Sequence, residues 1–195
     1  MGKEPLTDEI VVVAGLPRCG TSMMMRMLEA GGLPVVVDGV RGPDGDNPNG
    51  YYEFEPVKRL DRDTAWLPGA RGRVVKMVSA LLLALPGDHR YRVVFMERDP
   101  TEMLASQHAM LARHGGAGAA GPPPEREAAA FRRHLATLFA RLDRRPNFAL
   151  LRASYHDVLG DPHGQAERVN RFLGRNLDVA AMAAVVDPAL HRQRA

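Results

Sequence analysis

Short β-branched apolar runs alternate with longer amphipathic stretches along this 195-residue chain. The short runs predict buried strands, and the stretches in which apolar residues recur every three to four positions predict helices. The predicted strands are 10–14, 33–37, 73–78, 91–97 and 148–151. The predicted helices are 20–30, 55–65, 99–114, 125–144, 155–159, 162–173 and 178–186.

The order of these elements predicts an α/β fold. Strands that alternate with helices form a mainly parallel central sheet with helices on both faces, a three-layer α/β/α architecture. We expect residues 1–195 to form a single domain. Mobile loops are expected at 41–50 and 115–124, where Gly, Pro, Asn and Asp or Gly, Ala and Pro accumulate.

The helix predicted to begin near residue 99 has the clearest start signal in the chain. Asp99 is a suitable N-cap, Pro100 suits the first helical position, and Glu102 has the spacing of the reciprocal partner in a capping box. This helix directly follows a predicted strand, so its first turn lies at the carboxyl end of the sheet, where ligands bind in such folds.

Composition and charge exclude several classes of function. The chain is 45% hydrophobic and 25% charged, with a formal net charge of +3, which is ordinary for a globular protein. Its basic residues are mostly arginines scattered along the chain, with only three lysines, and the chain has a single tryptophan. Because a nucleic-acid site needs clustered basic residues interleaved with aromatic ones, no nucleic-acid partner is expected. The seven histidines show no metal-ligand spacing, and no metal is expected.

The single cysteine, Cys19, excludes an intrachain disulfide and is typical of a reducing cytoplasm. The first residues are acidic, unlike a signal peptide, and no apolar run approaches the roughly 20 residues that a membrane helix needs. The expected location is therefore cytoplasmic, with no membrane partner. The sequence leaves the oligomeric state open.

Residues 10–22 differ in an informative way from a nucleotide-binding P-loop. Gly15 and Gly20 have the P-loop spacing after a buried strand, but Thr21 and Ser22 stand where Lys and Ser or Thr are expected. Backbone N–H groups, the helix start, two hydroxyls and Arg18 favour an anion site in a P-loop NTPase-like fold. The missing lysine indicates a nucleotide whose end is not an ordinary triphosphate; the alternative is a structural turn that binds nothing.

Four segments together resemble the sulfotransferase family, in its compact bacterial form. The loop 16–22 is similar to the family's 5′-phosphosulfate loop, and 74–76 is similar to the strand that carries its catalytic lysine. The third segment, 93–100 together with Ser106, resembles the family's 3′-phosphate motif. The fourth segment, 155–162 followed by 172–174, resembles the family's later Tyr-x-Asp-Leu and Phe-Leu-Gly region.

This resemblance implies a donor, 3′-phosphoadenosine 5′-phosphosulfate (PAPS), with 3′-phosphoadenosine 5′-phosphate (PAP) as product and no magnesium requirement. The implied ligands of the 5′-phosphosulfate lie in the loop: Arg18, Cys19, Gly20, Thr21 and Ser22. Arg98 and Ser106 are implied at the 3′-phosphate, and Tyr155 near adenine. Lys76 and Arg18 are the candidates to stabilise charge on the departing nucleotide; the alternative for Lys76 is a strand-end lysine that reaches water.

The general base is less defined. Many family members have a histidine two residues after the lysine, but this chain has Val78 there. Glu53 is the candidate instead, because a carboxylate beside aromatic residues can have a raised pKa suited to accepting a hydroxyl proton. Glu55 and Asp38 are alternatives.

We therefore expect an enzyme that transfers a sulfuryl group from PAPS to a hydroxyl or amine of a small-molecule acceptor. Two other functions are compatible with the same residues. One is a kinase or nucleotidase with a degenerate P-loop, and the other is a catalytically silent nucleotide-binding module.

Overall fold

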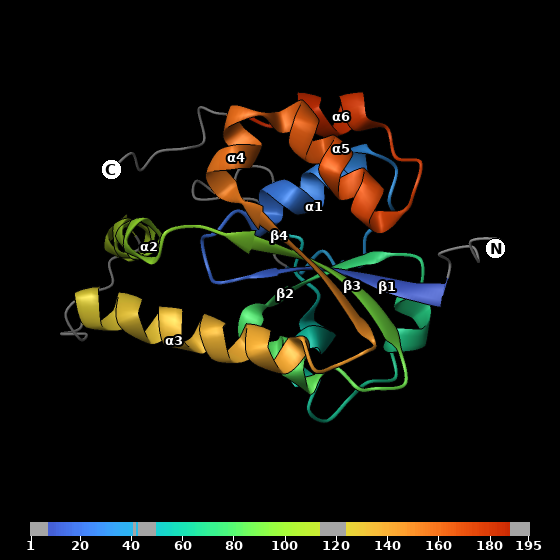
Figure 1. Ribbon diagram of the computed structural model, residues 1–195, viewed down its shortest axis with the longest axis horizontal. Helices are drawn as coiled ribbons and strands as arrows, with labels where there is room; N and C mark the ends of the chain where they lie inside the picture. The colour runs from blue at the N-terminus through green and yellow to red at the C-terminus, as the bar shows by residue number, and fades with distance from the viewer. Residues whose placement is uncertain (1–7, 41, 43–49, 114–123, 188–195) are drawn as a thin grey trace.

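The computed structural model describes residues 8–40, 42, 50–113 and 124–187, and a parallel four-stranded sheet runs through its centre (Figure 1). The strands are β1 (Glu9–Gly15), β2 (Val74–Val78), β3 (Arg90–Glu97) and β4 (Phe148–Ser154), in the order β2-β1-β3-β4. All three neighbouring pairs are parallel, so the predicted α/β class is confirmed.

Helices cover both faces of this sheet, as Figure 1 shows. On one face lie α1 (Thr21–Ala30), α4 (Tyr155–Gly160), α5 (Pro162–Leu173) and α6 (Val179–Ala184). On the other lie α3 (Pro124–Leu142) and the 3₁₀ helices η2 (Glu55–Arg59), η3 (Leu67–Ala70) and η4 (Ser79–Ala84). The last helix, α2 (Pro100–Arg113), follows β3 at the carboxyl edge of the sheet.

Strand β1 is the centre of the core because it pairs on both sides and every one of its residues is buried. Successive strand side chains point to opposite faces. Accordingly, Val11 and Val13 pack in the cluster beneath α1, whereas Val12 and Ala14 pack in the cluster that includes α3. The continuous apolar run that predicted this strand thus reflects burial on both faces.

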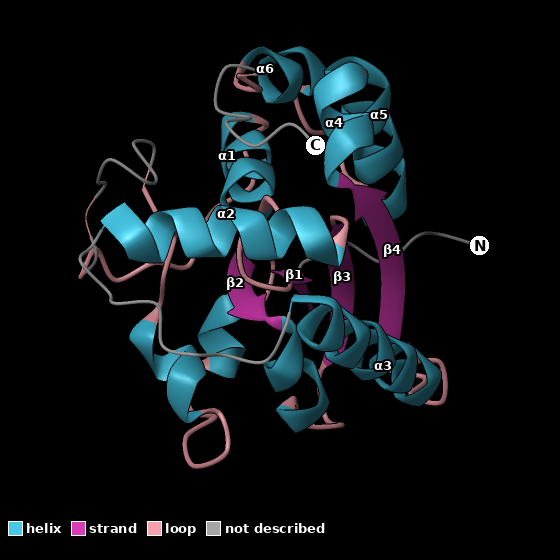
Figure 2. Ribbon diagram, turned by 90° about the vertical axis from the view of Figure 1, so that its left-hand side faces the viewer, coloured by secondary structure: helices cyan, strands magenta, loops and turns pink. Residues whose placement is uncertain are grey.

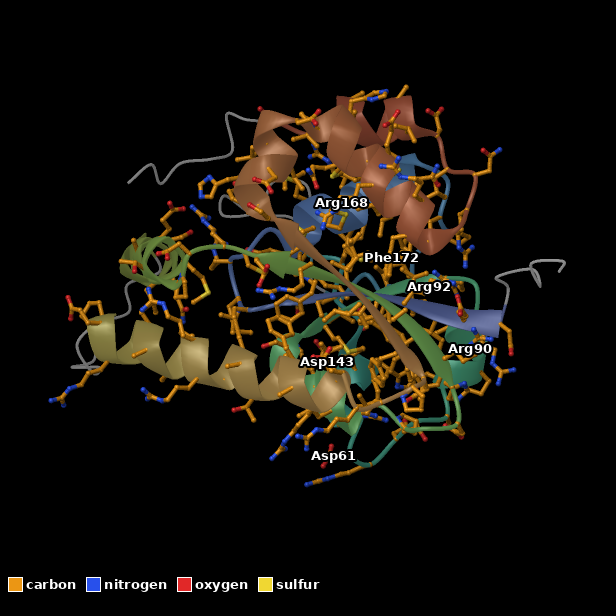
Figure 3. The ribbon with its side chains drawn as sticks, viewed as in Figure 1. Asp61, Arg90, Arg92, Asp143, Arg168 and Phe172 are labelled. Carbon is orange, nitrogen blue, oxygen red and sulfur yellow. The ribbon has the colours of Figure 1, made fainter. Side chains whose placement is uncertain are left out.

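The carboxyl ends of the four strands meet at one edge, which Figure 2 views with α2 crossing in front of the sheet. The loop between β1 and α1 begins at this edge. The opposite edge is held by ion pairs: Arg90 and Arg92 both contact Glu9, and Arg92 Nη1 donates to the Phe172 carbonyl oxygen at 2.5 Å (Figure 3). These ion pairs and this hydrogen bond connect β1, β3 and α5 at the amino ends of the strands, on the opposite side of the sheet from the loop between β1 and α1.

Asp99 caps α2, and Pro100 is the first residue of this helix, as predicted. Asp99 Oδ1 accepts hydrogen bonds from the backbone N–H groups of Thr101, at 2.8 Å, and Glu102, at 3.4 Å. Burial acts to raise the pKa of Asp99, but the hydrogen bonds to the helix start outweigh it and lower that pKa. This cap fixes where α2 begins, and hence where its inward-facing side chains lie.

Two predicted elements are wrong in type. The strand predicted at 33–37 is a single bridge between Val35 and Val74, because Pro34 offers only its carbonyl to β2 and the chain then leaves the sheet. The helix predicted at 55–65 ends after the short 3₁₀ helix η2. Asp63 accepts a hydrogen bond from the Ala65 N–H, a local turn that competes with helix.

The predicted mobile loops 41–50 and 115–124 lie outside the described residues, apart from residues 42, 50 and 124. Among the helices that are described, none is both long and apolar enough to cross a membrane.

Candidate functional site

The loop between β1 and α1 requires glycine at both of its predicted glycine positions. A Cβ on Gly15 would lie 2.8 Å from the Met96 carbonyl oxygen, and one on Gly20 would lie 2.5 Å from Cδ2 of Tyr155. Arg18 and Gly20 both adopt left-handed backbone conformations, with φ of 66° and 94°. The loop therefore curls tightly onto the start of α1, the geometry in which N–H groups and a helix N-terminus attract an anion.

Cys19 contributes its backbone to this loop rather than its thiol. Its side chain is buried in the core beneath α1, and burial raises the pKa of the thiol to about 12. A position at a helix start can lower a thiol pKa, but here desolvation dominates. The Cys19 N–H donates to the Leu16 carbonyl oxygen at 3.4 Å.

Four predicted donor-binding residues come together on one side of the loop; we call Arg18, Arg98, Ser106 and Tyr155 the arginine cluster. Arg18 Nε donates to Ser106 Oγ at 3.3 Å, and Arg98 Nη1 donates to the Arg18 carbonyl oxygen at 3.4 Å. The Arg98 guanidinium lies 4.6 Å from the centre of the Tyr155 ring, a cation–π distance. Residues 88 positions apart in sequence thus meet at the carboxyl edge.

The sequence interpretation missed two residues that contact this cluster. Glu102, predicted only as a helix cap, accepts from Arg98 Nε at 3.2 Å and lies 2.9 Å from His156 Nε2. Burial acts to raise the pKa of Glu102, but the hydrogen bonds and charges of His156 and Arg98 lower it. The i, i+4 spacing of Arg98 and Glu102 was the available signal. The carboxylate fixes one side of a guanidinium that is only 6% exposed.

Lys76 lies on the other side of the loop. It is on β2, in register with Val13, and its Nζ donates to Ser22 Oγ at 3.4 Å and to the Tyr51 carbonyl oxygen. Ser22 Oγ is also within 3.4 Å of that carbonyl oxygen. We call Lys76, Ser22 and the Tyr51 carbonyl the lysine cluster. It joins a strand, the first turn of α1 and a segment that precedes η2.

The segment that supplies the Tyr51 carbonyl has an unusual backbone. Gly50 and Tyr52 have φ of 83° and 53°, and positive φ is strained for a tyrosine. The Tyr52 hydroxyl donates to Glu29 Oε2 on α1 at 2.5 Å; burial first, and then Glu29, raises the pKa of this hydroxyl. The turn is thereby fastened to the same helix whose start forms the loop.

Two of the candidate bases, Glu53 and Glu55, follow this turn in sequence, and the third, Asp38, forms hydrogen bonds with their backbone. Glu53 Oε2 lies 3.5 Å from Lys58 Nζ, and Glu55 Oε1 lies 2.5 Å from the same nitrogen. Asp38 accepts backbone hydrogen bonds from Glu55 and Val40, which lower its pKa. Both oxygens of Asp38 are therefore occupied by the backbone, whereas Glu53 directly continues the strained turn beside Lys76.

The geometry brings three cations to one glycine loop: Arg18 from the loop itself, Arg98 from the end of β3 and Lys76 from β2. The electrostatic influence of both Arg98 and Lys76 reaches the buried Cys19. Cations at the start of a helix bind an anion strongly where solvent is limited. Within the described ranges, no three His, Cys, Asp or Glu side chains gather as a metal-ligand set.

A sequence model of the Sulfotransferase family matches residues 47–178, more than half of the chain. The matched region contains Lys76, Arg98, Ser106 and Tyr155, and it begins after the loop 15–22. No curated protein sequence matches the chain at a significant level.

Solved structures are similar over almost the whole chain. The sulfotransferase domain of the olefin synthase from Synechococcus PCC 7002 is 14% identical, with a TM-score of 0.55 over 97% of this chain and 88% of that domain. The sulfotransferase domain from the curacin biosynthetic pathway is 14% identical, with a TM-score of 0.52 over 93% and 88%. Sulfotransferase STF1 from Mycobacterium tuberculosis H37Rv is 18% identical, with a TM-score of 0.54 over 91% and 70%. At these identities the likeness shows a shared fold.

Proposed function

Because the chain belongs to the sulfotransferase family, we propose that it transfers a sulfuryl group from PAPS to a hydroxyl or amine of a small-molecule acceptor. The observation that carries this proposal is the convergence of Arg18, Arg98 and Lys76 on one glycine loop that lacks a P-loop lysine.

The donor would bind with its two anionic ends on different parts of the site. Gly20, Thr21 and Ser22 at the start of α1 would hold the 5′-phosphosulfate, together with Arg18. Arg98 and Ser106 would hold the 3′-phosphate, and the Tyr155 ring would lie near the adenine. Glu102 would keep the Arg98 guanidinium oriented through its hydrogen bond to Nε.

The transfer would be an in-line displacement at sulfur. The acceptor oxygen or nitrogen forms a bond to sulfur while the bond from sulfur to the bridging oxygen breaks, and the electron pair stays on the departing PAP. Lys76 and Arg18 would stabilise the negative charge that develops on this bridging oxygen. Glu53 would accept the proton of the acceptor, with Glu55 and Asp38 as alternatives.

Isothermal titration with PAP in the absence of magnesium tests the donor site. We expect binding, and we expect the Arg98→Ala variant to bind at least roughly tenfold more weakly, because a buried charge-assisted contact to phosphate is lost. Arg62→Ala is the matched control, since Arg62 is 86% exposed and pairs only locally with Asp61 at 3.3 Å among the contacts described.

A transfer assay with ³⁵S-labelled PAPS and a panel of hydroxyl and amine acceptors tests the reaction. Labelled product is expected. Magnesium-dependent binding of ATP in preference to PAP would instead favour a kinase or nucleotidase. PAP binding with no transfer to any acceptor would favour a silent nucleotide-binding module.

A further inference from the structure

Exposed valines lie on β2, the strand that carries Lys76, and on the segment that bridges to β2. Among the described residues, the large hydrophobic side chains that stand out as exposed are Val37, at 43%, Val40, at 72%, and Val78, at 45%. We call these three residues the valine patch. Single exposed valines are common on protein surfaces, so their significance depends on where they lie.

Two of the three can be placed from the sheet register. Val78 is two residues after Lys76, so both side chains point to the same face of β2, and Val78 pairs with Gly15, the first residue of the loop. Val35 bridges Val74 on the outer side of β2 in the parallel sense, and the Val36 N–H donates to the Val74 carbonyl oxygen. Val37 therefore lies two residues after the bridge to β2, where the chain leaves the sheet.

The third valine is placed by the contacts of Asp38. Asp38 Oδ1 accepts from the Val40 N–H at 3.0 Å, Oδ2 accepts from the Glu55 N–H, and the Asp38 N–H donates to the Glu53 carbonyl oxygen at 3.4 Å. The segment that holds Val37 and Val40 is thus joined to the segment that holds the candidate base. Lys76 contacts the Tyr51 carbonyl, two residues before Glu53, so these contacts connect the valine segment to the lysine cluster.

The charges of this region are directed to one another and to the backbone. Lys58 lies between Glu53 and Glu55, and its pKa is raised chiefly by the hydrogen bond to Glu55. The backbone hydrogen bonds to Asp38 lower its pKa and fix its carboxylate. These charged groups form local contacts, and the large hydrophobic side chains that stand exposed in the same region are the three valines.

Building on the proposed function, we propose that the acceptor is an uncharged molecule with an apolar body, and that Val37, Val40 and Val78 contact this body while its hydroxyl lies between Lys76 and Glu53. The step itself is unchanged: the acceptor oxygen bonds to sulfur, its proton goes to Glu53, and PAP leaves with the electron pair. Burying the apolar body against the valine patch selects the acceptor through its transfer free energy from water.

The test compares four hydroxyl acceptors with labelled PAPS: 2-naphthol and 1-octanol as uncharged apolar probes, glucose as an uncharged polar probe and 4-hydroxybenzoate as an anionic one. We expect kcat/KM to be at least roughly tenfold higher for the two apolar probes. Equal or higher values for glucose or 4-hydroxybenzoate would overturn the inference while leaving the proposed function intact.

Variants connect this preference to the patch. Val78→Thr replaces a methyl by a hydroxyl of similar size and should raise KM for 2-naphthol roughly fourfold, with PAP affinity unchanged. Val37→Thr combined with Val78→Thr should raise it further. Val179→Thr is a control for the chemical change at a partly buried position away from the patch, because Val179 packs against the core beneath α1 and begins α6. An unchanged KM in the double variant would refute the patch as the acceptor surface.

A binding measurement separates this inference from the proposed function. 2-Naphthol is fluorescent, so its binding to the PAP-loaded protein is measurable without turnover. If the protein transfers no sulfuryl group but binds 2-naphthol, and this binding weakens in Val78→Thr, the valine patch is supported as a binding surface and the proposed transferase function is rejected. Absence of 2-naphthol binding by a protein that binds PAP would reject the apolar surface alone.

Discussion

The two sides of the glycine loop are built differently. In the arginine cluster, side chains contact one another: Arg18 with Ser106, and Arg98 with Tyr155 and Glu102. In the lysine cluster, by contrast, Lys76 donates a hydrogen bond to the backbone. The acceptor is the Tyr51 carbonyl oxygen, which belongs to a turn with a strained backbone at Tyr52. The Arg98 side chain is 6% exposed, whereas Val78 is an exposed residue.

This difference corresponds to the different demands that the proposed function makes on the two sides: nucleotide binding at the arginine cluster and acceptor binding at the lysine cluster. A side that binds one fixed nucleotide gains from interlocked, buried side chains, because pre-ordered charges lose little freedom on binding. A side that defines the acceptor is built from loop backbone and exposed side chains, which can vary without disturbing the sheet. Substitutions on the first side should therefore change PAP affinity, and substitutions on the second should change turnover.

The largest effect is expected for Lys76→Met, which removes the charge of the lysine cluster while preserving much of the side-chain volume. The transfer rate should fall roughly 10²–10³-fold, since a preorganised cation no longer stabilises the departing oxygen. PAP affinity, measured by titration, should change only a few-fold. Lys76→Arg keeps the charge and should retain more activity. A comparable loss of PAP affinity and rate would mean that the two sides are not separable.

Gly20→Ala is expected to have the next largest effect, on the nucleotide side. Gly32→Ala is a matched control, because both glycines have nearly the same φ, 94° and 93°, but only Gly20 faces Tyr155. The left-handed backbone alone costs about 1–2 kcal/mol for a non-glycine residue. Urea unfolding should show about this loss for Gly32→Ala and a greater loss for Gly20→Ala. PAP affinity should fall only in Gly20→Ala. An equal fall in both variants would mean that the loop between β1 and α1 has no specific role in binding PAP.

Tyr52→Phe examines the acceptor side. It removes the hydrogen bond to Glu29 and with it one restraint on the strained turn. We expect kcat to fall roughly fivefold, the factor that corresponds to about 1 kcal/mol for one hydrogen bond, with PAP affinity unchanged. Steady-state kinetics and titration measure the two quantities. Weaker PAP binding in Tyr52→Phe would show that the turn also supports the nucleotide side.

The smallest effect is expected for Glu102→Gln, and it depends on pH. Because the folded-state pKa of Glu102 lies below its usual value of 4.5, its contribution to stability is complete above about pH 4.5 and is lost as the pH falls through the folded-state pKa. The difference in urea midpoint between the wild-type protein and Glu102→Gln should therefore narrow as the pH falls below about 4.5. Glu167→Gln serves as an exposed control. A difference that stays constant with pH would mean that the Glu102 charge is not coupled to folding.

The arrangement of the arginine cluster was predictable because its residues lie at positions that local patterns define. Arg98 follows a buried strand, and Ser106 lies two turns into a helix whose N-cap is recognisable in the sequence. Gly15 and Gly20 have the spacing of a P-loop. Parallel strands bring such positions to one edge without any further information. The four-stranded α/β sheet was predictable for the same reason.

The surroundings of the lysine cluster were less predictable because their geometry depends on single backbone conformations. Nothing local indicates that Tyr52 adopts positive φ or that the Tyr51 carbonyl faces Lys76. The expected strand at 33–37 also failed here, since Pro34 limits its pairing with β2 to one bridge. Where tertiary contacts override local preference, a sequence pattern identifies the segment but not its conformation.

The central position of β1 has a consequence for biosynthesis. The ribosome makes this strand first, yet both of its neighbours in the sheet, β2 and β3, are encoded far downstream. Helix α1 is available at once to shield Val11 and Val13, but the opposite face, with Ile10 and Val12, has no cover until the middle of the chain emerges. The nascent protein therefore carries an uncovered apolar strand during much of its synthesis, the state in which chaperones recognise a chain and in which unpaired strands of neighbouring copies can associate.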